Sequence, residues 1–156
     1  MIETGHPWMV DAKWRGIDLT RAYLTRNRGQ VAACLEGLGT ERRELVLALL
    51  GLSYDDLLGD LGAPPMNVRD LDEVAALAPP ESEFATTAAV RRVAAKEAGF
   101  AEAVAGLGLV DQIHVIAVCT VVMLLDARGH AGALAHIDEE AAACERMGYP
   151  RPYAVT

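Results

Sequence analysis

The chain has 156 residues, which suits one domain, and folding at this size buries about 70% of the unfolded surface, so neither a metal ion nor a disulfide bond is required for stability. Hydrophobic residues make up 52% of the sequence but aromatic residues only 5%, which favours closely packed helices over a β-sandwich. The net charge of −8 comes from residues 46–156, which would repel nucleic acid, whereas residues 1–45 are close to neutral.

The N-terminal residues lack a basic leader followed by an apolar core, and we therefore expect a cytoplasmic protein. Three cysteines, Cys34, Cys119 and Cys144, are an odd number without close spacing. This pattern indicates reduced thiols and argues against a disulfide framework or a CxxC metal site. We expect no cofactor.

Residues 1–17 are predicted to form an irregular N-terminal arm, because Gly5, Pro7 and two tryptophans interrupt any regular pattern. Trp8 and Trp14 need cover, since exposed indole rings are costly, and we expect them to dock on the body of the protein or, alternatively, on a partner. The basic side chains that follow could face an acidic protein partner or the acidic part of this chain. They are Arg21, Arg26 and Arg28.

A first helical hairpin is predicted over residues 18–61, with Asp18 as the N-cap of its first helix. The first helix places Leu24, Val31, Leu35 and Leu38 on one face. Gly37 and Gly39 end it, and Thr40 caps the second helix.

An alternative interpretation makes residues 29–45 a helix-turn-helix-like DNA reader, with Arg42 and Arg43 in the major groove. Glu41 and Glu44 flank these arginines and would face phosphate groups. For this reason we expect an ordinary hairpin rather than a nucleic-acid partner.

Two Pro-Pro pairs bracket residues 62–80, which are predicted to be a connector with at most one short helix around residues 70–77. The second half, residues 81–148, should contain an alanine-rich helix weakened at Gly99, an apolar segment and a last helix from about Gly129 to Met147. Residues 149–156 form a tail.

The two halves share one pattern, because residues 31–50 overlay residues 100–119 with their Gly-Leu-Gly triplets in register. Each segment is predicted to form a helix, a tight turn bounded by glycines and a second helix. Two explanations remain open, a true internal duplication and a shared hairpin geometry between alanine-rich segments. A repeat array is excluded, since fewer than three copies occur.

The most apolar segment runs from Val115 to Leu125 and is too short to cross a bilayer as a helix, so we expect no membrane association. Its β-branched residues would suit a strand, but its length and the lack of comparable strands elsewhere favour a helix. Within this segment, a core or oligomer strip is formed by Val115, Val118, Val122 and Leu125.

A helix that is apolar on every side must be covered on every side. The rest of the chain could close around it in a monomer, or a second copy could complete the cover in a homodimer. A ligand pocket against the segment is the third possibility.

A metal-dependent enzyme is a further alternative, because His136 and Glu140 lie one turn apart on the last helix and His130 precedes them. An ion pair between His136 and Glu140 on the helix surface explains the same spacing without a metal ion.

The sequence thus predicts an all-α fold, a compact bundle of about five helices arranged as two hairpins around a central apolar helix. It predicts a non-catalytic protein-interaction or regulatory module, because no sequence motif of an active site is found. We expect this module to act as a homo-oligomer, most simply a homodimer, in which a second copy covers the apolar helix.

Overall fold

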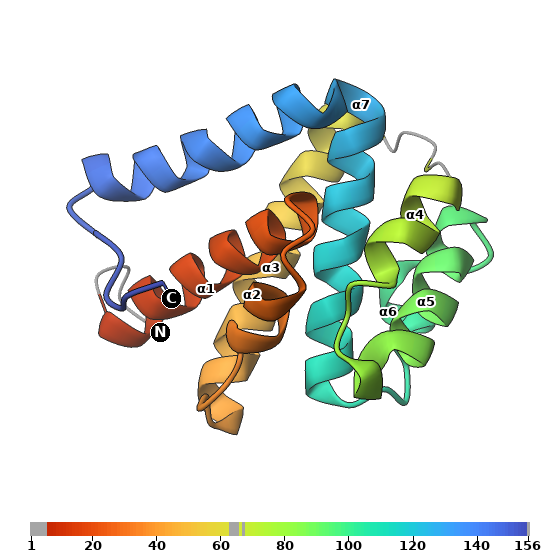
Figure 1. Ribbon diagram of the computed structural model, residues 1–156, viewed down its shortest axis with the longest axis horizontal. Coiled ribbons are helices and arrows are strands. Elements are labelled where there is room, and N and C mark those ends of the chain that lie inside the picture. Colours follow the sequence, from red (N-terminus) through yellow and green to blue (C-terminus); the bar gives the residue numbers. More distant parts are fainter. Residues whose placement is uncertain (1–5, 63–65, 67, 156) are drawn as a thin grey trace.

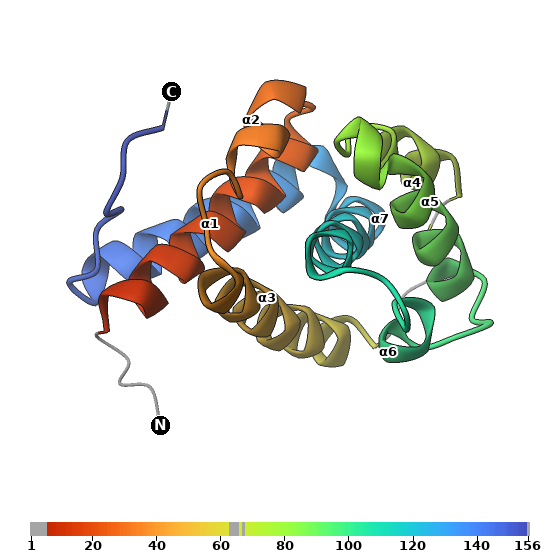
Figure 2. The same ribbon diagram turned by 90° about the horizontal axis from the view of Figure 1, so that it is seen from below.

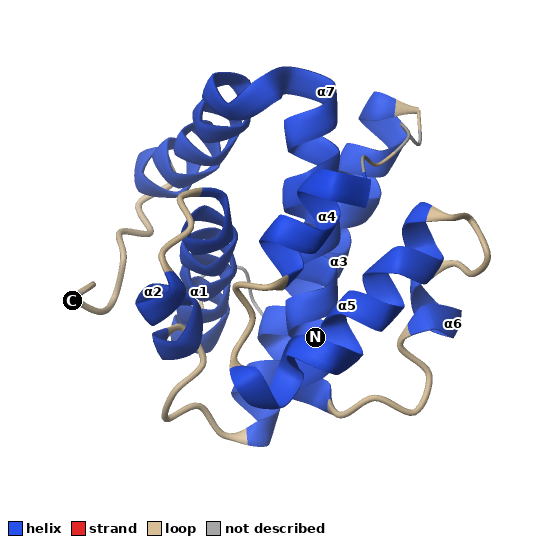
Figure 3. Cartoon of the chain, turned by 45° about the vertical axis from the view of Figure 1, so that its right-hand side comes forward, coloured by secondary structure: helices blue, strands red, loops and turns tan. Residues whose placement is uncertain are grey.

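The computed structural model describes residues 6–62, 66 and 68–155, and 76% of the structure is helical, with no strand in the described part. The all-α prediction is confirmed, although the described residues form seven helices rather than about five (Figures 1 and 3). They are α1 (Pro7–Leu24), α2 (Arg28–Ala33), α3 (Thr40–Leu61), α4 (Val68–Ala75), α5 (Pro80–Ala94), α6 (Phe100–Ala103) and α7 (Leu109–Arg146).

The apolar segment is helical and lies in the centre of the molecule. It belongs to α7, whose residues 113–124 are all buried. Helices α1, α3, α4 and α5 all contact α7, and Figure 2 shows them arranged around its first part. By length and composition α7 could also span a bilayer, but 67% of its most apolar window is buried inside the fold. One chain therefore covers residues 113–124 by itself.

The strip proposed for the core or for an oligomer interface is part of that core. Val115, Val118 and Val122 are fully buried, and Leu125 is partly buried and packs against the same cluster. The three valines are therefore unavailable to a second copy of the chain.

Helix α7 is divided by Gly129, which has φ 70° and ψ 177°, a conformation that only glycine adopts readily. We name the part before it α7N (residues 109–128) and the part after it α7C (residues 130–146). In Figure 1 the chain turns sharply between them, and α7C runs back over α1. The two helices predicted here are thus present, joined through one glycine.

The prediction of an irregular arm is wrong for residues 7–17, which form the first half of α1. His6 accepts a hydrogen bond from the backbone N–H of Trp8, and Pro7 occupies the first helical position, where its missing N–H costs nothing. Asp18 is consequently a buried residue in the middle of α1 and not an N-cap. Residues 1–5 of the predicted arm lie outside the described part.

The first helix of the predicted hairpin is split in two. Helix α1 ends at Leu24, and Arg26 takes a left-handed conformation with φ 57° before α2 begins. The four residues expected on one face, Leu24, Val31, Leu35 and Leu38, are nevertheless all buried. The predicted alanine-rich helix is split in the same way, since α5 ends at Ala94 and Lys96 has φ 58°.

The connector contains one short helix, α4, as predicted, although α4 begins two residues before Asp70. Residues 63–65 and 67, which include the first Pro-Pro pair, lie outside the described part. The tail is anchored to α1, because Trp14 Nε1 donates to the backbone oxygen of Tyr149 at 2.8 Å and Arg151 forms two hydrogen bonds with Asp18.

The similarity between the two halves extends beyond the Gly-Leu-Gly triplets. Gly37 and Gly106 both have positive φ, at 75° and 82°, and Gly39 and Gly108 are the N-caps of α3 and α7. Helices α1 and α5 end with the same hydrogen-bond pattern, in which Asn27 N–H donates to the oxygen of Ala22 and Glu97 N–H to that of Arg92. The order α1–α2–α3 is therefore repeated as α5–α6–α7N.

Helix α4 and α7C complete this correspondence. Residues 71–78 (LDEVAALA) align with residues 137–144 (IDEEAAAC). Arg21 of α1 pairs with Asp138 of α7C at 2.6 Å, and Arg91 of α5 pairs with Asp72 of α4 at 2.9 Å. The last helix of each half therefore packs against the first helix of the other half: α4 contacts α5, and α7C contacts α1.

Candidate functional site

A groove of about 430 Å³ lies between α1, α3 and α7C, and we call it the α1–α3–α7 groove. Its apolar body includes two large side chains that solvent reaches, Leu52 at 62% and Met147 at 63% exposure. The other apolar residues along it are Met9, Val10, Trp14, Leu49, Leu57, Ala143 and Cys144. A volume of this size, with mostly apolar walls and a few polar groups, is typical of small-molecule sites.

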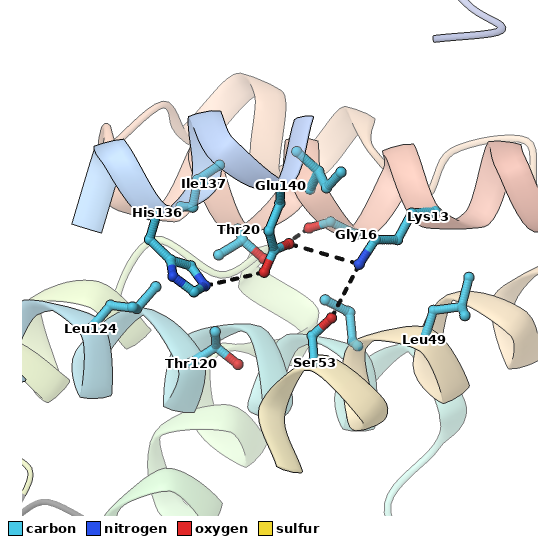
Figure 4. Close-up of a pocket in the computed structure, with 12 residues that line it drawn as sticks. Lys13, Gly16, Thr20, Leu49, Ser53, Thr120, Leu124, His136, Ile137 and Glu140 are labelled. Carbon is cyan, nitrogen blue, oxygen red and sulfur yellow. Dashed lines mark hydrogen bonds and ion pairs between the residues drawn. The ribbon is translucent and has the colours of Figure 1, made fainter. Parts of the chain in front are cut away.

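One end of the groove is polar, and Figure 4 shows how its side chains meet. Lys13 extends from α1 between Ser53 of α3, at 3.3 Å, and Glu140 of α7C, at 3.8 Å. Glu140 also lies 3.1 Å from Nε2 of His136. This cluster separates the groove from a smaller cavity of about 20 Å³, which has room for one water molecule.

The hydrogen bonds around His136 fix its tautomer. Arg128 lies 2.9 Å from Nδ1 of His136, and a guanidinium group can only donate. Nδ1 is therefore the acceptor, and Nε2–H donates to Glu140. Burial alone would raise the pKa of Glu140, but the hydrogen bond from His136 and the charge of Lys13 outweigh it, so that this pKa lies below its ordinary value.

Comparison of the two halves shows which side chains leave this groove open. In the register of the repeated elements, Val74 corresponds to Glu140, Leu77 to Ala143 and Val122 to Ser53. Val74 and Val122 are buried, with 2% and 0% exposure, and α4 packs closely on α5 and α7. Smaller or polar side chains at the corresponding positions leave the space between α7C and α3 unfilled.

A second surface feature is an exposed stripe on α5, which we call the α5 stripe. It consists of Glu81, Phe84, Ala88 and Arg92, which follow one another at helical spacing and are all exposed. Phe84 is 87% exposed, the highest value among the large exposed hydrophobic side chains of the described part. In the register of the two halves it corresponds to Trp14, which is buried under the tail.

The residues predicted to bind an acidic partner are partly engaged within the chain. Trp14 is buried and docks on the tail, and Trp8 is 43% exposed. Arg21 pairs with Asp138 and Arg26 with Glu73, at 2.6 and 2.8 Å. Arg28 is exposed at the first position of α2. The acidic half of the chain itself therefore occupies two of the three arginines.

The two arginines of the DNA-reading alternative are engaged with other parts of the chain. Arg42 pairs with Asp11 of α1 at 2.7 Å, and Arg43 donates to the backbone oxygen of Leu35 at 3.4 Å. Both side chains are half-buried, so this geometry does not present them to a major groove.

The three residues of the metal alternative do not come together. His136 and Glu140 are hydrogen-bonded to each other, whereas His130 is exposed at the start of α7C. Across the described ranges, no group of three His, Cys, Asp or Glu side chains is placed to hold a metal ion.

The sequence interpretation missed four polar residues of the groove, namely Lys13, Ser53, Asp56 and Asp60. Asp56 and Asp60 are one turn apart on α3, and this spacing was visible in the sequence. Lys13 was assigned to an irregular arm, and only its position on α1 brings it to Ser53, 40 residues away.

Comparisons with family models, with curated proteins and with solved structures give no match to this chain.

Proposed function

We propose that this protein is a non-catalytic helical regulatory module that binds a small apolar ligand in the α1–α3–α7 groove. The observation that carries the proposal is the groove itself, whose volume and apolar walls suit such a ligand. Leu52 and Met147, which solvent reaches, would be covered by the ligand, and their burial would contribute to its affinity.

The chemistry of the groove supports binding rather than catalysis. Lys13, Ser53, His136 and Glu140 are engaged with one another, and the thiol at the groove, Cys144, has a pKa raised mainly by burial. A thiol with a raised pKa is a poor nucleophile, because the thiolate is the reactive form.

Filling the groove tests this proposal. Ala143→Leu places in α7C the side chain that Leu77 supplies at the corresponding position of the other half. We expect the wild-type protein to bind the neutral dye Nile red with saturable fluorescence, and Ala143→Leu to abolish that signal while the melting temperature stays the same or rises. Ala135→Leu, on the exposed face of α7C, is the control that keeps the signal. Unchanged dye binding in Ala143→Leu contradicts the proposal.

We also propose that the module acts as a homodimer, and the α5 stripe favours this second element. Two α5 helices that pair antiparallel about a twofold axis would place Phe84 of each chain on Ala88 of the other. The same pairing would set Glu81 opposite Arg92, so that the stripe is complementary to itself in charge as well as in shape.

Sedimentation equilibrium over a series of protein concentrations tests the dimer. We expect Phe84→Ser to weaken association, with no loss of fold because this side chain is exposed. Glu81→Lys should weaken it as well, and the charge-swapped pair Glu81→Lys with Arg92→Glu should restore it. A wild-type protein that stays monomeric at every concentration rejects this element of the proposal.

A further inference from the structure

The polar residues that line the α1–α3–α7 groove are unequally charged. They include three carboxylates, Asp56, Asp60 and Glu140, but only one ammonium group, that of Lys13. The whole chain adds to this imbalance with a net charge of −8. A ligand in the groove therefore experiences a negative potential.

The carboxylates differ in whether the protein already neutralises them. Glu140 has Lys13 at 3.8 Å and a hydrogen bond with His136 at 3.1 Å. Asp56 and Asp60 make no hydrogen bond or ion pair with any side chain of the described part. They follow each other at one helical turn on α3, beside the apolar residues Leu52 and Leu57.

We infer that the ligand of the groove is an organic cation, an amine attached to an apolar body of about the size of naphthalene. This inference rests on the proposed function, since it names the chemical class of the ligand at the same site. The apolar body would lie between α3 and α7C, and the ammonium group would face Asp56 and Asp60. An anionic ligand of the same shape would meet the two carboxylates with repulsion.

Three probes with the same ring system test the inference by isothermal titration calorimetry. They are the cation 1-naphthylmethylammonium, the neutral 1-methylnaphthalene and the anion 1-naphthaleneacetate. We expect the cation to bind about fivefold more tightly than the neutral probe, because two exposed carboxylates each contribute a modest attraction. The anion should bind more weakly than both. Added salt should reduce the advantage of the cation.

A pair of matched double variants assigns this preference to the groove. Asp56→Asn with Asp60→Asn should remove the advantage of the cation. Glu44→Gln with Asp55→Asn removes the same charge from exposed positions of α3 that do not line the groove, and it should leave the advantage unchanged.

The outcomes separate this inference from the proposed function. If the cation and the neutral probe bind equally, and Ala143→Leu blocks both, the groove binds ligands but the inferred charge preference is wrong. If both double variants reduce the preference to the same extent, the net charge of the protein causes it and the assignment to Asp56 and Asp60 is wrong. If no probe binds in a manner that Ala143→Leu blocks, the proposed function itself is wrong.

Discussion

His114 shows how a single polar residue is accommodated in the most apolar part of the molecule. Only 1% of it is exposed, and its Nδ1 lies 2.7 Å from the hydroxyl group of Tyr23 in α1. Burial lowers the pKa of His114 to about 4 and raises that of Tyr23, so both side chains are neutral in the folded protein at neutral pH. Nothing in the local sequence around His114 identifies this partner, because Tyr23 is 91 residues away.

The pKa of His114 predicts a dependence of stability on pH. Since the folded value of about 4 lies below the ordinary value of 6.5, the unfolded chain takes up a proton first as the pH falls through this interval. The free energy of unfolding should fall by about 1.4 kcal/mol per pH unit, in total by about 3 kcal/mol, and the full stability should be present above pH 6.5.

Urea denaturation at several pH values between 7.5 and 5 measures this slope. His114→Gln should be less stable at pH 7.5 but should lack the contribution of this residue to the slope, while the more exposed histidines His6, His130 and His136 are common to both proteins. Parallel curves for the wild type and the variant would show that His114 is not the group that titrates.

The role of Asp18 could not be predicted from the sequence. An aspartate before a periodic apolar segment is typical of an N-cap, and we predicted one. In the structure its carboxylate accepts two hydrogen bonds from Arg151 and one from Tyr153, both more than 130 residues away. A buried carboxylate requires such partners, but nothing in the local sequence identifies them.

Hydrophobic spacing predicted correctly which segments are helical. It predicted less well where the helices begin and end. The central helix, the short helix of the connector and the turns with Gly-Leu-Gly are all present. The breaks after α1 and α5 could not be predicted, because they lie at Arg26 and Lys96, two non-glycine residues with positive φ. Glycine is the usual residue in this conformation, and we therefore expected the alanine-rich helix to be weakened at Gly99.

The role of Gly129 in the fold can be tested by substitution, because this one residue separates α7N from α7C. Its φ of 70° with ψ of 177° is strained for any residue with a Cβ atom, and Gly129→Ala should lower the free energy of unfolding by about 2 kcal/mol. Gly59→Ala is the matched control inside α3, where an added Cβ meets no atom within 4 Å. It should raise the free energy of unfolding by about 0.5–1 kcal/mol.

Chemical denaturation of both variants compares these effects. A Gly129→Ala protein as stable as the wild type would mean that the turn between α7N and α7C accepts another backbone conformation. The prediction for the Gly129 turn would then be wrong, whatever the result for Gly59→Ala.

At the scale of the whole molecule, the two halves have corresponding helices but differ where the groove lies. The sequence indicated the correspondence only through the Gly-Leu-Gly register, and the matching ion pairs Arg21–Asp138 and Arg91–Asp72 became visible with the fold. The groove itself could not be predicted. It depends on Glu140 and Ala143, which align with Val74 and Leu77 only after α4 and α7C are recognised as equivalent.

The most direct measurement of ligand binding in the α1–α3–α7 groove is an NMR titration of the ¹⁵N-labelled protein with 1-naphthylmethylammonium. We predict that saturable shift changes will concentrate on the backbone amides of the groove walls in α1, α3 and α7C, with Leu52, Ser53, Ala143 and Met147 among the most affected. Changes spread evenly over the surface, or concentrated on α4 and α5, would contradict the account.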